Sequence, residues 1–139
     1  MLSYALAAHI EFIGPCSAKP LLSARAQESA PHVGAASIEV LERFGVDYQG
    51  TERGLNSAFG TAVGMDALEI ISDSELRSYG WCFSVDGVVP EVFADSIALT
   101  EVRHSVRWFF AYAHYRNGEW VAQCRPAHLL KPQKFCPGN

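Results

Sequence analysis

The sequence lacks several features that would place a protein in a common functional class. Its eleven Lys and Arg residues are scattered and its net charge at pH 7 is -4, which disfavours nucleic-acid binding because that requires clustered basic residues. No apolar run approaches the roughly 18 residues that a membrane-spanning helix needs. No motif indicates a cofactor or a reaction. We therefore assign no catalytic residue, no metal ligand and no cofactor.

The cysteines also lack a Cys-x-x-Cys pair, which disfavours a zinc site of the usual spacing. They are Cys16, Cys82, Cys124 and Cys136. An even number of cysteines in a small protein fits a disulfide framework in an oxidising compartment, but four cysteines allow three pairings and the sequence does not choose among them. Reduced, buried thiols are the alternative.

The N-terminal residues leave the compartment open. Ala24-Arg25-Ala26 has the small-x-small form of a signal-peptidase site, although Glu11 and Pro15 interrupt the apolar region before it. If residues 1–26 are a cleaved signal, the protein is secreted or periplasmic. In the other interpretation, Tyr4 to Ile13 is an ordinary strand or short helix that covers the main sheet, and a cytoplasmic location stays open.

The length of 139 residues, about half of them apolar, predicts one compact domain. We expect an irregular segment, a signal or a linker over 1–36, an α+β domain over 37–126 and a tail over 127–139. Ser37 to Tyr48 is interpreted as a strand. The clearest helix is predicted to begin at Gly60-Thr61 and to end near 72–74, because Val63, Ala67, Ile70 and Ile71 follow the spacing of one buried face.

Two hairpin dipeptides, Asp86-Gly87 and Asn117-Gly118, stand between aromatic or β-branched runs, which predicts two-residue turns. Strands are therefore expected on both sides of each turn, the longest over Val102 to Tyr115. Counting back from the second turn gives a predicted register. It pairs Arg116 with Glu119, Tyr115 with Trp120, and Ala111 with Cys124.

These elements predict an α+β fold, with a mostly antiparallel sheet of about five strands and one main helix packed on one face. The order is β-grasp-like and resembles the transcobalamin C-terminal-like domain family over about residues 37–110. The matching residues are Gly60-Thr61-Ala62-Val63-Gly64-Met65-Asp66-Ala67-Leu68, Gly80-Trp81-Cys82-Phe83-Ser84-Val85-Asp86-Gly87 and Val106-Arg107-Trp108. The resemblance implies a non-catalytic binding or surface-display module.

The residues that suggest recognition gather near the second hairpin, since amphipathic rings give large contact area with few rotors to fix. They are Tyr112, His114, Tyr115, Arg116 and Trp120. We expect them to bind a protein or a small ligand, and the sequence leaves the oligomeric state open. Two alternatives remain: a small cysteine-dependent enzyme using Cys82 or Cys124 with a histidine, and an inhibitor or accessory protein that acts by occlusion.

Overall fold

The computed structural model describes residues 8–138. Its strands are β1 (His9–Ile13), β2 (Leu22–Arg25), β3 (Tyr48–Thr51), β4 (Gly54–Ala58), β5 (Leu68–Ser72), β6 (Glu75–Val85), β7 (Ser105–Arg116) and β8 (Glu119–Pro126). The helix α1 spans Val33–Arg43. The single-turn 3₁₀ helices are η1 (Gly64–Ala67), η2 (Ala94–Ser96), η3 (Leu99–Glu101) and η4 (Ala127–Leu129).

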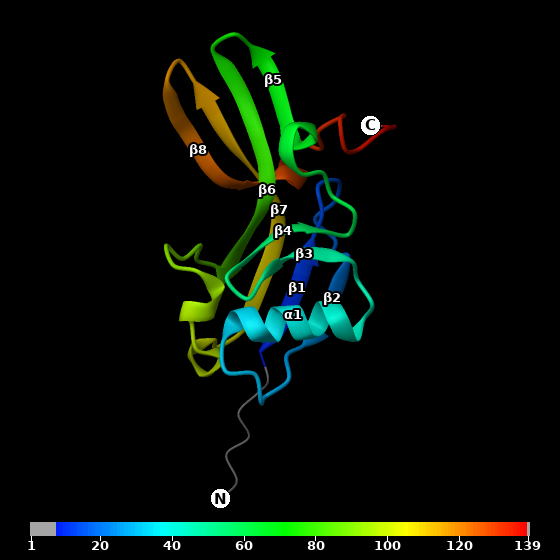
Figure 1. Cartoon of the computed structure of the whole chain (residues 1–139), viewed down its shortest axis with the longest axis vertical. Coiled ribbons are helices and arrows are strands. Elements are labelled where there is room, and N and C mark those ends of the chain that lie inside the picture. Colours follow the sequence, from blue (N-terminus) through cyan, green and yellow to red (C-terminus); the bar gives the residue numbers. More distant parts are fainter. Residues whose placement is uncertain (1–7, 139) are drawn as a thin grey trace, which may run out of the picture.

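The main sheet is built around the long strand β7. Its strand order is β2-β1-β7-β6-β5, and β8 also pairs with β7. Along one edge of β7, residues 105–109 pair in parallel with β1 and residues 111–116 pair antiparallel with β8, while β6 occupies the other edge throughout. The β5–β6 and β7–β8 hairpins project together at one end (Figure 1). The predicted α+β class, with one helix on a mostly antiparallel sheet, is confirmed.

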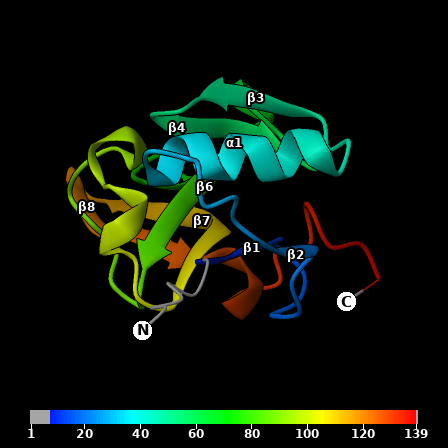
Figure 2. The same ribbon diagram turned by 90° about the horizontal axis from the view of Figure 1, so that it is seen from below.

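The helix α1 and the separate β3–β4 hairpin form a second layer against the main sheet (Figure 2). His32 caps the helix, since its Nδ1 accepts a hydrogen bond from the Ala35 N–H at 3.0 Å. The buried face follows helical spacing and consists of Val33, Ala36, Ser37, Val40 and Leu41. The prediction of a strand over Ser37–Tyr48 is therefore wrong, because the helix that begins at Val33 includes most of that segment.

The helix predicted from Gly60-Thr61 is also wrong. Gly60 and Gly64 have φ angles of 73° and 61°, which an α-helix does not accommodate. The segment forms a turn and η1, and residues 68–72 then form β5, which pairs with β6. The Ile70 and Ile71 side chains, expected on a buried face, are 64% and 43% exposed.

The segment 1–36, expected to be irregular, contains β1, β2 and the first turn of α1. Ile10 and Phe12 of β1 are fully buried, between β2 and β7. The described part of Tyr4–Ile13 forms the strand β1, which agrees with the interpretation of this segment as a strand that covers the main sheet. Residues 4–7 lie outside the described residues. Cleavage at Ala26 would remove two strands of the main sheet.

Both predicted two-residue turns are confirmed. Asp86 and Gly87 have φ angles of 50° and 87°, and Asn117 and Gly118 have 51° and 85°. The Asp86 carboxylate accepts hydrogen bonds from the backbone N–H groups of Arg103, His104 and Ser105, at 2.7–3.0 Å. Ser105 is the first residue of β7. A strand was also expected directly after the first turn, but within the described residues that segment makes only one bridge to β6, between Val85 and Val88.

The predicted β7–β8 register is confirmed at the turn and wrong farther from it. Arg116 pairs with Glu119 and Tyr115 with Trp120, but Ala111 pairs with Pro126 instead of Cys124. Two bulges in β8 cause the difference, and Cys124, in the second, has a φ of 49°. Bulges bend a strand and increase its twist. Within residues 8–138 no helix is long and apolar enough to cross a membrane.

Candidate functional site

The Cys82–Cys124 disulfide joins β6 to β8 although β7 lies between them in the sheet. Neighbouring strands are about 4.8 Å apart, so two strands on either side of a third are roughly 9.5 Å apart in a flat sheet. The Cα atoms of Cys82 and Cys124 are only 5.8 Å apart. The bulged β8 therefore bends over the sheet, and β6, β7 and β8 form a curl.

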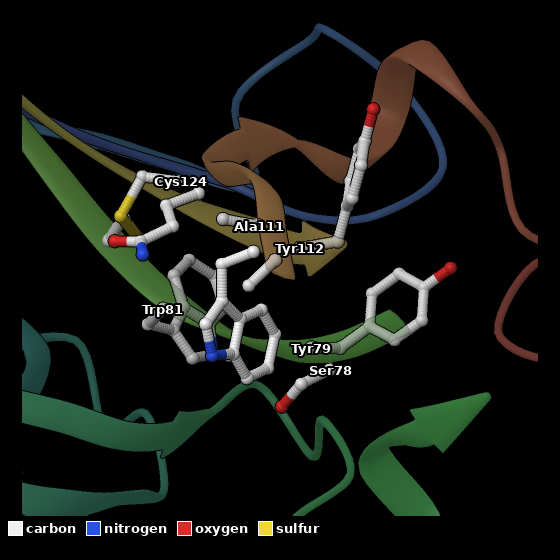
Figure 3. A pocket seen from close by; sticks show the side chains of 11 residues that line it. Ser78, Tyr79, Trp81, Ala111, Tyr112 and Cys124 are labelled. Atoms are coloured by element: carbon white, nitrogen blue, oxygen red, sulfur yellow. A yellow bond between two sulfur atoms is a disulfide. The ribbon is translucent and has the colours of Figure 1, made fainter. Parts of the chain in front are cut away.

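A pocket of about 340 Å³ lies inside this curl. Small residues from β6 and β7 line it, namely Ser78, Gly80, Ala111 and Ala113, together with Trp120, Gln123 and the disulfide of β8. A Cβ atom built on Gly80 would meet nothing within 4 Å. Figure 3 shows Trp81 and Tyr79 beside this space, which we call the curl pocket.

Two further pockets lie between β6 and β4, each of about 430 Å³. Both are lined by Leu55, Asn56 and Trp81. One extends to Arg53, Pro90 and Phe93, and the other to Gln49 and residues 62–64. We call the two together the β4 slot. Trp81 also lines the curl pocket, so all three pockets share this residue, and we call them collectively the groove.

The groove carries little charge. Among its described lining residues Arg53 is the only charged one, and none is a carboxylate or a histidine. The Arg53 guanidinium lies 4.1 Å above the Phe93 ring, a cation–π contact that orients the side chain. Amide side chains supply polar atoms from Gln49, Asn56 and Gln123, and hydroxyls come from Thr51, Ser78, Tyr79 and Tyr112. The Trp81 Nε1–H is already donated to Thr61 Oγ1 at 2.8 Å.

The structure divides the five predicted recognition residues into two groups. Tyr112 and Trp120 line the curl pocket, and Trp120 is 52% exposed. Tyr115 contacts the Trp120 ring in a T-shaped pair with centroids 5.3 Å apart. His114 and Arg116 instead both contact Glu75, at 2.6 and 3.1 Å. These two residues bind the ends of β6 and β7 together and do not line the groove.

The charged groups near the hairpin ends are engaged with one another. Hydrogen bonds from His114 and then Arg116 hold the pKa of Glu75 below its usual range. Burial and a hydrogen bond to Glu69 raise the pKa of Tyr79 to about 12, and Arg77 forms an ion pair with the same Glu69 at 2.8 Å. These groups stabilise the sheet, and of them only Tyr79 lines the groove.

The cysteines form the pairs Cys16–Cys136 and Cys82–Cys124. A thiol enzyme needs a free thiolate beside a base, and none of the four cysteines is free. The first pair fixes the C-terminal residues, where Phe135 contacts Tyr79 with ring centroids 4.9 Å apart. Within residues 8–138, no group of three or more His, Cys, Asp or Glu side chains is arranged to hold a metal ion.

Sequence reasoning missed Arg53, Asn56, Phe93 and Gln123 as lining residues. One signal was available for Phe93, because the segment 88–93 is rich in apolar residues around Pro90. In the structure Val88, Val89, Val92 and Phe93 are all 45–67% exposed, which is unusual for a contiguous apolar segment. The other three depend on how β4 and β8 pack against β6, which no local pattern encodes.

No family model matches the chain, and neither the curated proteins nor the solved structures contain a match.

Proposed function

We propose that the protein is a non-catalytic binding module that holds its ligand in the groove. The observation that supports this most is that three separate elements each place an aromatic ring at the groove. Trp81 comes from β6, Trp120 from β8 and Phe93 from the loop before η2. Ligand sites are typically concave and mostly apolar, with a few polar groups that set orientation. Amide side chains and Arg53 supply those groups here.

The ring of Trp120 is the principal contact in this proposal. It is half exposed, yet Tyr115 holds it from one side, so little side-chain freedom is lost when a ligand packs on it. Aromatic residues with these properties dominate binding energies. An accessory protein that acts by occlusion would use the same surface, and it would form a stoichiometric complex without turnover.

A β-grasp-like fold and a relationship to transcobalamin C-terminal-like domains form part of the same proposal. The hairpin of the Gly80-Trp81 to Asp86-Gly87 motif supports them, since this segment forms a strand followed by a two-residue turn. The Gly60 to Leu68 motif, which the resemblance takes as a helix start, forms a turn, η1 and the first residue of β5.

The experiment screens the full chain against an oligosaccharide array and a phage-displayed library of random peptides, and then compares variants on every binder found. Trp120→Ala removes the ring, and Gly80→Leu fills the curl pocket, where the structure leaves room for a side chain. Leu129→Ala is the matched control, because Leu129 is 69% exposed and does not line the groove.

We expect the two groove variants to weaken binding at least tenfold, since aromatic anchors contribute about 2 kcal/mol or more. The control should bind like the wild type. All three variants should retain the wild-type thermal unfolding temperature within a few degrees. The proposal fails if no probe binds, or if every binder is insensitive to both groove variants.

A further inference from the structure

The strand β6 has one long stretch of unpaired edge. Strand β7 pairs with it from Glu75 to Val85, but on the opposite edge β5 pairs only with Glu75 to Ser78. Val85 makes a bridge to Val88. Within the described residues, no strand other than β7 pairs with residues 79–84. In an antiparallel pair every second residue directs its N–H and C=O away from the partner strand.

This stretch of edge lacks the charges, prolines and bulges that usually protect such a strand, although β4 packs near it. Natural edges carry charged side chains, prolines or bulges, or they are covered. Residues 79–84 read Tyr-Gly-Trp-Cys-Phe-Ser, without a charge or a proline, and pair with β7 in continuous register. By contrast, the neighbouring edge strand β5 is short and has a register shift.

The pockets of the groove lie on both sides of this edge. Gly80 and Cys82 face the curl pocket with Ala111 and Ala113, whereas Trp81 belongs to the main core and borders the β4 slot. Successive side chains of a strand point to opposite faces. An additional strand beside β6 would therefore place alternate side chains in the curl pocket and in the β4 slot.

We propose that the ligand is an extended segment of a partner protein that adds to β6 as a strand along residues 79–84. This inference rests on the proposed function and specifies the partner for the same groove. Backbone hydrogen bonds give such complexes affinity, and pockets for alternate side chains give them specificity. An apolar residue enters the curl pocket beneath Trp120, and small or apolar residues enter the β4 slot.

The charge of the groove specifies one more property of the segment. Arg53 has no ion-pair partner among the described residues and no carboxylate shares its pocket. A guanidinium fixed over Phe93 therefore favours a carboxylate on the bound chain. The segment carries an Asp or Glu, or its own C-terminal carboxylate, at the end near Arg53.

The test uses the best 12-residue peptide selected from the phage library against the full chain. Two synthetic forms are compared with it, one N-methylated at the even positions and one at the odd positions. Because only alternate N–H groups of an added strand bond to β6, one form should lose binding at least 30-fold and the other should lose less than threefold. Amide hydrogen exchange of the complex should show new protection at alternate residues within 79–84.

The outcomes separate this inference from the proposed function. If peptide binding depends on Trp120 but both methylated forms bind like the parent, or protection appears along β5 or β2 instead, strand addition is wrong and the binding groove stands. Binding of oligosaccharides alone, lost in Trp120→Ala, would also exclude strand addition and leave the groove as the binding site. Failure of every probe overturns both. Arg53→Gln should weaken an acidic peptide about tenfold and leave its Asn or Gln analogue unchanged.

Discussion

Cys82 and Cys124 are bonded across the strand β7, with their Cα atoms 5.8 Å apart. The same residues line both the curl pocket and part of the β4 slot. Cys124 lies in a bulge of β8, where it adopts a φ of 49°. The disulfide and the bulge together hold β8 over β6, so the shape of the groove depends on a covalent bond.

Loss of this bond should reduce both stability and binding. The pair closes a loop with a sequence separation of 42, so Cys82→Ser with Cys124→Ser should lower the free energy of unfolding by about 3–4 kcal/mol. Binding of the selected peptide should weaken even where the variant is fully folded. Cys16→Ser with Cys136→Ser is the control, since that bond lies outside the groove. Equal effects of the two double variants on binding would contradict this account.

The contact between α1 and the sheet depends on a buried hydroxyl. Ser37 is 1% exposed, and its Oγ accepts a hydrogen bond from Trp108 Nε1–H at 2.8 Å and donates to the Val33 carbonyl. Ser37→Ala leaves the indole N–H without a partner, which costs about 1–3 kcal/mol. Urea unfolding measures the change. Ser57→Ala, which removes another buried hydroxyl but no indole contact, serves for comparison.

The two hairpins could be predicted because their turns are local. Asp86-Gly87 and Asn117-Gly118 need positive φ at both positions, and few dipeptides allow it. Counting from such a turn gives the correct register for only as long as no residue is inserted, which is why Tyr115–Trp120 is right and Ala111–Cys124 is wrong. The bulge at Cys124 has no local signature, since its positive φ is supported by a disulfide to a distant strand.

The helix was predictable, and the error has an identifiable cause. The i, i+3, i+4, i+7 and i+8 spacing begins at Val33, inside the Ala- and Ser-rich segment interpreted as irregular, and dividing the chain at Ser37 removed its first turn. The remaining Ile38 and Val40 then favour a strand. The groove could be predicted only in part: Tyr112 and Trp120 belong to the aromatic hairpin, whereas Arg53 and Asn56 reach it through the packing of β4 on β6.

A glycine in the first turn of α1 allows the β3–β4 hairpin to approach the helix. A Cβ on Gly34 would lie 1.7 Å from the Glu52 carbonyl oxygen. Gly→Ala in a helix normally stabilises by about 1 kcal/mol, but here the turn at Glu52 must move. Gly34→Ala should therefore lower the free energy of unfolding by about 1–3 kcal/mol. Gly45→Ala is a useful second variant, since its penalty arises from a φ of 68° with nothing within 4 Å.

The projecting ends of β6 and β7 should loosen in acid. Hydrogen bonds from His114 and Arg116 hold the pKa of Glu75 below its usual value of 4.5, so the charged carboxylate is favoured in the folded state. Its contribution to stability is then fully present above pH 4.5 and is lost as the pH falls through the lowered folded pKa. The protection factors of the Glu75 and Arg116 amides, which correct for the intrinsic slowing of exchange in acid, should fall over that range, more than those of the Phe83–Trp108 pair near the other end of β6. In Glu75→Gln the protection should already be low at pH 6 and should lack this acid-dependent step; a step of unchanged size in the variant would show that another group controls the end of the sheet.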